Sequence, residues 1–574
     1  MVLSNESVRR EELKGLLISM DVVIEKLMKL GNTPGLSMLV LVEGEVVFQR
    51  GYGLASISAN VPATSSTIYP IASITKGFVA AACGVLVAEG KLSWDTPISA
   101  FVPEFDPECD PNLGHEVTLV DILSHRTGLE DQPTLYSGPN GVPLFSDLTT
   151  LLSVINKMGG GIFRKNWSYN PLPYALVTKI IEKASGTTLA ELLDSRIFQP
   201  LGMTSTSLVV FSVGTPNEHR VARPYASTAS HDYIERKVPE TAYGFPFDSS
   251  MGIQSSIEDM ARWSKAMIAS YLTISQKSNS VVPRTSTSIL PEMATILKPW
   301  CPLPNNPGGI PAYCLGWFLH YGHFIFDDMF DFDGQIDLLE WPCTMPIVKG
   351  NEPPRKILYH SGIGNGFTSS IHIYPEQGDA VVVLGNSSYS GDAVDCISRL
   401  VTATICDQDL CIDELENNLK HYTDLETGRW QKVETELMMQ LTLCTKGPIP
   451  ATNALLGCYT NSERNLSIVI KHDRRTPSAG SRPFIDATVS FGNMTDLGVP
   501  LWGFCHNTLC FLPTEREYQE WGMSYMTDWG QYLLHISESL EEKRVLGLWW
   551  QFDPNEDAIW FRKGDARSCE LLPT

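Results

Sequence analysis

Hydrophobic and polar positions along the first hundred residues predict a helix, a hairpin and a buried helix. Residues 7–30 have the period of an amphipathic helix. Residues 38–42 and 46–50 are apolar-rich runs on either side of Glu43-Gly44-Glu45, which is typical of a β-hairpin. Residues 77–87 are apolar or small at every position, so they predict a helix that is buried nearly all round.

The pattern further along the chain predicts an α+β fold. Residues 175–186 have a helical period, while 369–374 and 380–384 are strand-like runs joined by a turn. With another helix expected from about residue 390, these elements predict an antiparallel sheet with N- and C-terminal helices packed against it. Residues from about 85 to 300 are expected to form a helical lobe.

The pattern changes after residue 410, which we take as the end of a first domain, 1–410. Residues 411–450 are polar and are expected to form a linker. Residues 451–574 contain short β-like runs separated by turn signals, which predict a small all-β barrel or sandwich.

Composition narrows the class of protein. At 574 residues the chain is long for one core, so two or more domains are expected. With 43% apolar residues it should fold as a globule. A formal charge of −22 argues against a nucleic-acid partner, because phosphates would be repelled. We expect no membrane partner, because no uninterrupted apolar run is long enough to span a bilayer.

The N-terminal residues and the cysteines indicate a cytoplasmic location. Residues 1–12 lack the apolar core of a signal peptide. The 13 cysteines are odd in number and scattered, as expected of free thiols in a reducing compartment.

Ser73 and Lys76 are the first candidates for chemistry. They form an S-x-x-K pattern just before the predicted buried helix, and positions i and i+3 share a helix face. A desolvated Lys76 amine could therefore take the proton of the Ser73 hydroxyl. The alternative is that Ser73 only caps the helix and Lys76 is a solvated residue of its first turn.

Two later segments complete a family pattern. Tyr169 lies shortly before the helix at 175–186, and His360-Ser361-Gly362 precedes the strand pair. In this order the three motifs resemble the serine β-lactamase-related family, in its branch of class C β-lactamases, esterases, D-aminopeptidases and acyltransferases. The resemblance covers roughly residues 15–400, and further family-like pieces are residues 123–129, 251–260 and 313–317.

The resemblance implies a role for each motif. Ser73 would be the nucleophile, Lys76 its general base or proton relay, and Tyr169 the phenol that carries a proton to and from the leaving group. Because a free tyrosine has a pKa near 10, Tyr169 should lie beside a cation such as Lys76. The backbone N–H groups of Ser73 and Ile363 would form the oxyanion hole, with Ile363 on an edge strand. The implied active site lies where the helical lobe meets the sheet.

Two departures from the family pattern concern substrate binding, which the resemblance assigns to Asn170, His360, Ser361 and Gly362. The asparagine that usually stands two places after the tyrosine is here one place early, at Asn170. His360 stands where family β-lactamases usually have lysine. A histidine titrates near pH 6 to 7, so recognition of a penicillin carboxylate is not expected and an esterase, peptidase or acyltransferase is favoured.

Other residues have simpler interpretations. His125 is expected to make a structural hydrogen bond. No histidine or cysteine cluster has metal-ligand spacing, so no metal and no cofactor are implied. An insert at about 324–355, rich in aspartate and aromatic residues, is either a lid that selects substrate or a solvated surface excursion. Residues 455–461 (L-x-G-x-Y-x-N) resemble the start of the lipocalin-like domain of some peptidases in this family.

These observations predict a serine hydrolase that cleaves an ester or amide of a small molecule or peptide through a Ser73 acyl-enzyme. An acyltransferase using the same acyl-enzyme, for instance in natural-product assembly, is the nearest alternative. A catalytically silent binding protein on this scaffold is the third.

Overall fold

The computed structural model describes two compact units of the chain, and each is presented by itself. The first contains Met1–Asp131, Gly159–Ser227 and Tyr243–Glu426, and the second contains Gln132–Met158, Thr228–Ala242 and Thr427–Thr574. Residues 324–354 of the insert expected at about 324–355 lie outside the described residues. The described residues are 5–564 except 137, 140, 142, 146, 166, 209–217, 238–246, 278–288, 304–310, 323–354, 389–390, 409, 445–446, 474–483, 493–497, 523–525, 540 and 542–543.

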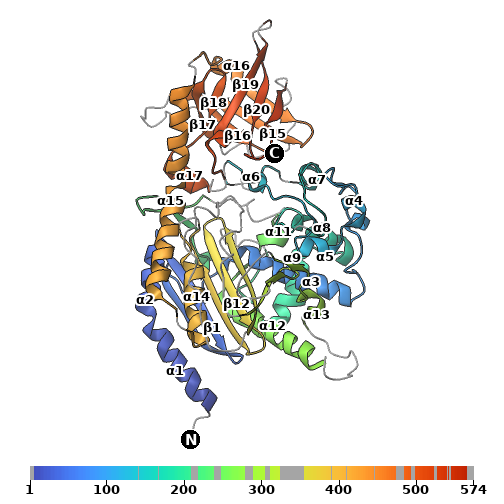
Figure 1. Cartoon of the computed structure of the whole chain (residues 1–574), viewed down its shortest axis with the longest axis vertical. Coiled ribbons are helices and arrows are strands. Elements are labelled where there is room, and N and C mark those ends of the chain that lie inside the picture. The colour runs from blue at the N-terminus through green and yellow to red at the C-terminus, as the bar shows by residue number, and fades with distance from the viewer. Residues whose placement is uncertain are drawn as a thin grey trace. The chain divides into compact units, whose positions relative to one another are not determined.

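A nine-stranded antiparallel sheet forms the centre of the first unit (Figure 1), in the order β3-β2-β1-β13-β12-β11-β10-β9-β8. All eight residues of β1 are buried, because both faces of the sheet are covered there. The predicted hairpin is confirmed, with Val42 opposite Glu45. The strands are β1 (Gly35–Val42), β2 (Glu45–Ser56), β3 (Val61–Pro62), β8 (Cys301–Pro302), β9 (Ala312–Tyr313), β10 (Phe318–Gly322), β11 (Arg355–Gly364), β12 (Phe367–Tyr374) and β13 (Asp379–Gly385).

Helices α1 (Asn5–Ser19), α2 (Asp21–Leu30) and α14 (Ala393–Ile405) cover one face of this sheet. Their apolar side chains pack on the residues of β1 and β13 that point to the same side, such as Val40 and Val383. The single helix predicted over 7–30 is two helices. The second begins at Asp21, whose carboxylate accepts hydrogen bonds from Arg50 and Tyr52 on β2 and so ties this point to the sheet.

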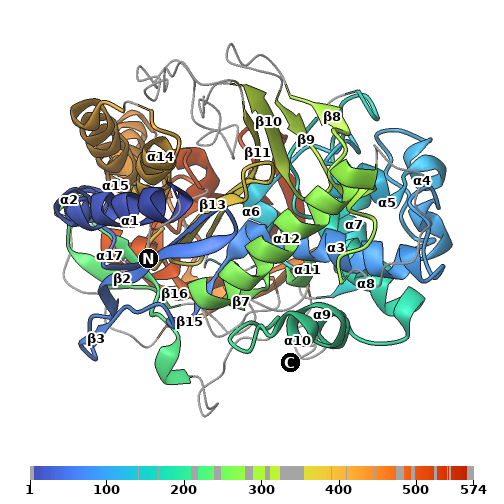
Figure 2. The ribbon, with the colours of Figure 1, turned by 90° about the horizontal axis from the view of Figure 1, so that it is seen from below.

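The helices of the lobe lie on the opposite side of the sheet, as Figure 2 shows for α12 (Ile257–Lys277) and α3 (Thr75–Ala88). Helix α3 is buried from Thr75 to Leu86, which confirms the predicted helix that is apolar all round. The other elements of the lobe within this unit are α4 (Leu113–Glu116), α5 (Leu119–Leu123), α8 (Tyr174–Ser185), α9 (Leu189–Leu193), α10 (Gln199–Leu201), α11 (Asp248–Met251), α13 (Met293–Ile296), β4 (Tyr69–Pro70), β5 (Tyr225–Ser227) and β7 (Gln254–Ser255).

The second unit is a closed eight-stranded barrel in which each strand pairs with the next and the last pairs with the first. This confirms the predicted all-β barrel. Helix α15 (Ile412–Leu443) occupies most of the stretch expected to be a linker, 411–450. The strands are β14 (Gly457–Asn461), β15 (Leu466–His472), β16 (Phe484–Phe491), β17 (Val499–Cys505), β18 (Thr508–Cys510), β19 (Leu533–Ser539), β20 (Arg544–Trp550) and β21 (Ile559–Lys563), with α6 (Pro133–Tyr136), α7 (Leu148–Asn156), β6 (Tyr233–Glu235), α16 (Thr452–Leu455) and α17 (Glu515–Trp521) outside the barrel order.

Aromatic rings make up much of the barrel core. Phe491 lies 4.6 Å from Trp550 and 4.9 Å from Phe511, measured between ring centroids. Trp502 and Trp550 are almost completely buried. These tryptophans therefore serve in packing. Among the helices that the structure describes, none combines the length and the apolar character needed to cross a membrane.

Candidate active site

Ser73 lies in a 3₁₀ turn, Ala72–Ile74, that leads directly into α3. The preceding residue, Ala72, has φ of +44°, a left-handed conformation that costs an alanine energy and is found where surrounding structure enforces it. Lys76 is one turn further on, and its Nζ is 3.0 Å from Ser73 Oγ. Ser73 is 7% exposed and Lys76 is fully buried. The two residues predicted from S-x-x-K are therefore in direct contact.

The surroundings of Lys76 favour its neutral form. Nζ also donates to the backbone carbonyl of Ser250 on α11, at 3.1 Å. Burial lowers the pKa of Lys76 from its ordinary value to about 7, and the negative charge of Asp131 opposes this shift. Near neutral pH a large fraction of the amine is unprotonated, so it can accept a proton from Ser73.

Tyr169 lies against Lys76, as the resemblance implied, but through its ring. Lys76 Nζ is 4.9 Å from the centroid of the Tyr169 ring and 5.3 Å from that of Tyr174. Such contacts stabilise the charged amine through the electron-rich ring faces. Tyr174, the first residue of α8, was not among the predicted site residues.

His125 fixes the segment that carries Tyr169. Its ring lies 4.2 Å from the Tyr169 ring, and its Nδ1 accepts a hydrogen bond from the backbone N–H of Asn170 at 3.1 Å. Its backbone carbonyl accepts from Ser168 N–H, also at 3.1 Å. His125 thus holds the residues on both sides of Tyr169. Burial and the charge of Lys76 keep the pKa of His125 well below its ordinary value.

Asn170, predicted as a substrate contact, has its side-chain amide engaged by the backbone. Its Nδ2 donates to the carbonyls of Glu130 at 3.0 Å and Leu129 at 3.4 Å, and its Oδ1 accepts from Leu172 N–H at 3.0 Å. The side chain is 2% exposed. Asn170 therefore ties the loop at 129–130 to the start of the segment before α8.

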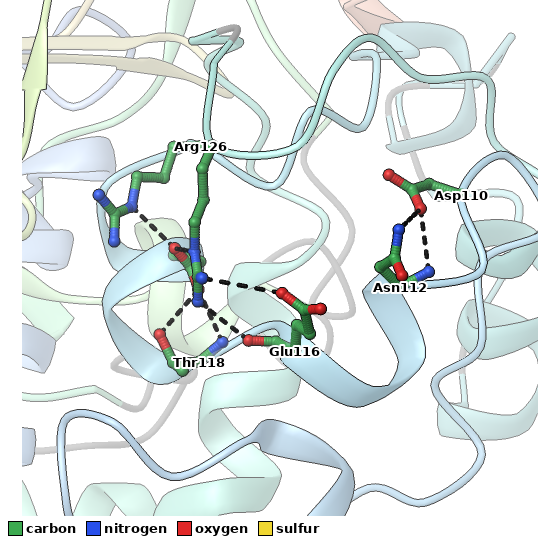
Figure 3. Close-up of polar contacts among 7 residues, drawn as sticks. Asp110, Asn112, Glu116, Thr118 and Arg126 are labelled. Carbon is green, nitrogen blue, oxygen red and sulfur yellow. Dashed lines mark hydrogen bonds and ion pairs between the residues drawn. The ribbon is translucent and has the colours of Figure 1, made fainter.

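A buried carboxylate anchors the chain that leads to His125. Asp121 caps its own helix through Thr118 and accepts hydrogen bonds from Arg126 and Arg164 at 2.8 to 2.9 Å. Figure 3 shows Thr118 and Arg126 in this network, with Glu116 beside it. Burial alone would raise the pKa of Asp121, but the bonds from Arg164 and Thr118 and the charge of Arg126 lower it overall.

His360 stands on β11 as a neutral, hydrogen-bonded ring. Its Nδ1 is 2.6 Å from the carbonyl oxygen of Ser361, which can only accept, so Nδ1 carries the proton. Its Nε2, 3.1 Å from the hydroxyl of Tyr313, then accepts a hydrogen bond from it. Burial and the charge of Lys76 lower the pKa of His360 to about 3. The expectation that this histidine titrates near pH 6 to 7 was wrong, because burial outweighs its ordinary basicity.

Gly362 brings β11 against the turn of Ser73. A Cβ at this position would lie 2.4 Å from the carbonyl oxygen of Ile71 and 2.5 Å from Ser369 Oγ, so only glycine fits. The Ser369 hydroxyl bridges the same point by donating to Ile71 O at 2.8 Å. Ile363 follows on the strand. Strand β11 is not an edge strand, since β12 and β10 flank it, but its pairing with β10 ends at Tyr359.

Three contributors to the site were missed from the sequence: Tyr174, Tyr313 and the carbonyl of Ser250. Tyr313 stood within a family-like piece, 313–317, which was the available signal. The carbonyl of Ser250 carries no sequence signal. Within the described ranges, no group of three or more histidine, cysteine or acidic residues is placed to hold a metal ion.

The amino-acid sequence was compared with known protein families and with characterised proteins. The family model described as Beta-lactamase matches residues 20–403. The chain is 24% identical over 573 residues to the unguisins hydrolase ungD' of Aspergillus campestris, covering 96% of this chain and 92% of that protein. It is 29% identical over 239 residues to esterase EstB of Burkholderia gladioli, covering 38% of this chain and 59% of the esterase.

A solved structure has a similar fold. An octameric penicillin-binding protein homologue from Pyrococcus abyssi superposes with a TM-score of 0.54 at 20% identity, over 95% of this chain and all of the other. Because the family model spans most of the chain and includes Ser73, Lys76, Tyr169 and His360, this protein belongs to the Beta-lactamase family.

Proposed function

We propose that the protein is a serine hydrolase that cleaves an ester or amide of a small molecule or peptide through an acyl-enzyme on Ser73. The observation that carries this proposal is the buried contact between Lys76 Nζ and Ser73 Oγ at 3.0 Å, with the pKa of Lys76 lowered to about 7. An amine that is neutral near pH 7 and touches a hydroxyl is suited to act as its general base.

The acylation step uses the groups already described. Lys76 Nζ takes the proton of Ser73 as Oγ bonds to the substrate carbonyl carbon. The negative charge that develops on the carbonyl oxygen is held by the backbone N–H groups of Ser73 and Ile363. When the bond to the leaving group breaks, the Tyr169 hydroxyl supplies the departing atom with a proton and regains one from Lys76.

Water completes the cycle by the same route in reverse. It gives a proton to the Tyr169 and Lys76 pair as its oxygen attacks the Ser73 ester, and Ser73 recovers its proton when the acid leaves. An acyltransferase would differ only in using another nucleophile in place of water. One relative that aligns with nearly the whole chain is named as a hydrolase of unguisins, which favours hydrolysis over acyl transfer. A cytoplasmic location fits the described cysteines, which are free thiols.

The decisive experiment is peptide mass spectrometry after treatment with a fluorophosphonate. We expect one adduct on Ser73, absent from Ser73→Ala and retained in Ser153→Ala, a control at a hydroxyl on the exposed side of α7. No adduct on Ser73 in the folded protein would refute the proposal and favour a silent scaffold. With an acyl ester as substrate, product that forms only with an added alcohol or amine would identify a transferase.

A further inference from the structure

The reaction proposed above does not use the aromatic rings that surround Tyr169 and His360. Trp167 lies 5.9 Å from Tyr313, 6.2 Å from Phe318 and 6.3 Å from Tyr169, between ring centroids. Phe318 in turn lies 5.2 Å from His360. We call Trp167, Tyr313 and Phe318 the aromatic cluster. Tyr313 and Phe318 are buried, whereas Trp167 is partly exposed.

Trp167 is partly exposed, but its indole N–H is covered. Its Nε1 is buried, and no acceptor among the described residues contacts it. A buried indole N–H normally has a hydrogen-bond partner, because leaving it without one costs free energy. Because this atom is covered, a bound molecule would reach Trp167 through the exposed part of the residue.

The charges near the cluster disfavour ionised substrates of either sign. His360 holds its single proton on Nδ1 and receives a hydrogen bond at Nε2, so it presents no positive charge to a carboxylate. Asp131 is close enough to affect Lys76 electrostatically, and its negative charge would repel an anion. Lys76, when protonated, would repel an ammonium group. An uncharged group is repelled neither by Asp131 nor by protonated Lys76.

We propose that Trp167, supported by Tyr313 and Phe318, binds an uncharged aromatic ring in the acyl part of the substrate. The acyl part is assigned because the cluster flanks His360 on β11, the strand expected to hold the acyl carbonyl through Ile363. Contact of the substrate ring with Trp167 adds to the burial of apolar area, while the buried rings of Tyr313 and Phe318 hold Trp167 in place. This inference rests on the proposed Ser73 acyl-enzyme and names its substrate class.

The test compares four ethyl esters with the full-length protein: phenylacetate, its 4-carboxy and 4-aminomethyl derivatives, and acetate. The released acid is measured by chromatography. We expect kcat/KM for phenylacetate to exceed that for either charged derivative by roughly tenfold or more. A preference for either charged ester, or equal rates for all three aromatic esters, would overturn the proposal. Labelling of Ser73 by fluorophosphonate in the same preparation shows separately whether the nucleophile is active.

Variants assign the effect to Trp167. In Trp167→Ala the ratio of kcat/KM for phenylacetate to that for acetate should fall by about tenfold. In Trp167→Phe, which keeps a ring and loses the N–H, this ratio should fall less than in Trp167→Ala. The matched control is Trp549→Ala in the barrel, where 43% of the residue is exposed, and its ratio should equal that of the unmodified protein. An unchanged ratio in Trp167→Phe and in folded Trp167→Ala would refute the role of Trp167.

Discussion

At the scale of single residues, the chemistry depends on the protonation state of Lys76. Its pKa is lowered to about 7, so the amine is charged below pH 7 and neutral above it. Because the neutral form is the base, kcat/KM should rise with pH and reach half its plateau near pH 7. Lys76→Arg should lose roughly 100-fold or more in kcat/KM, since a guanidinium keeps its proton. Rates on a neutral ester from about pH 5 to pH 9 test this, and a profile that falls through pH 7 would contradict it.

The second prediction for a single residue concerns the protonation state of His360. With its pKa lowered to about 3, the ring should stay neutral, with the proton on Nδ1, from about pH 5 upward. Nitrogen chemical shifts of ¹⁵N-labelled histidine report the tautomer directly, and His360→Gln assigns the signal. A doubly protonated His360 at pH 6 would show that burial and the charge of Lys76 do not control the pKa of this group.

At the scale of elements, the site depends on how closely β11 approaches the turn before α3. In Gly362→Ala the new Cβ would lie 2.4 Å from Ile71 O, so the turn that carries Ser73 must move. A shift of this kind can cost about 100-fold in rate, and we expect kcat/KM and fluorophosphonate labelling to fall together. The matched control is Gly364→Ala on the same strand, where the nearest atoms are 3.9 Å away and near-normal activity is expected. Equal activity of the two variants would contradict the close approach.

Some of these elements could be predicted from the sequence and others could not. The buried helix α3 and the hairpin of β1 and β2 follow from local patterns and were predicted, as was the pairing of Ser73 with Lys76. The break between α1 and α2 lies beside Asp21, whose contact with β2 no local pattern contains. The pKa of His360 depends on burial and on the charge of Lys76, which lies far away in the sequence, so composition and motif could not predict it.

At the scale of the whole molecule, the interior of the eight-stranded barrel in the second unit could be filled by side chains or by a ligand. Barrels of this size are either filled by side chains or hold one small ligand. Trp550 packs against Phe491 and donates through Nε1 to the carbonyl of Gln531 at 2.8 Å, so this barrel uses tryptophan as core. Trp550→Ala should therefore lower the free energy of unfolding by about 3 to 5 kcal/mol. The neighbouring Trp549 is 43% exposed, and Trp549→Ala should cost less than about 1 kcal/mol. Denaturant unfolding of both variants measures the difference, and a small loss for Trp550→Ala would instead indicate a barrel interior with room for a ligand.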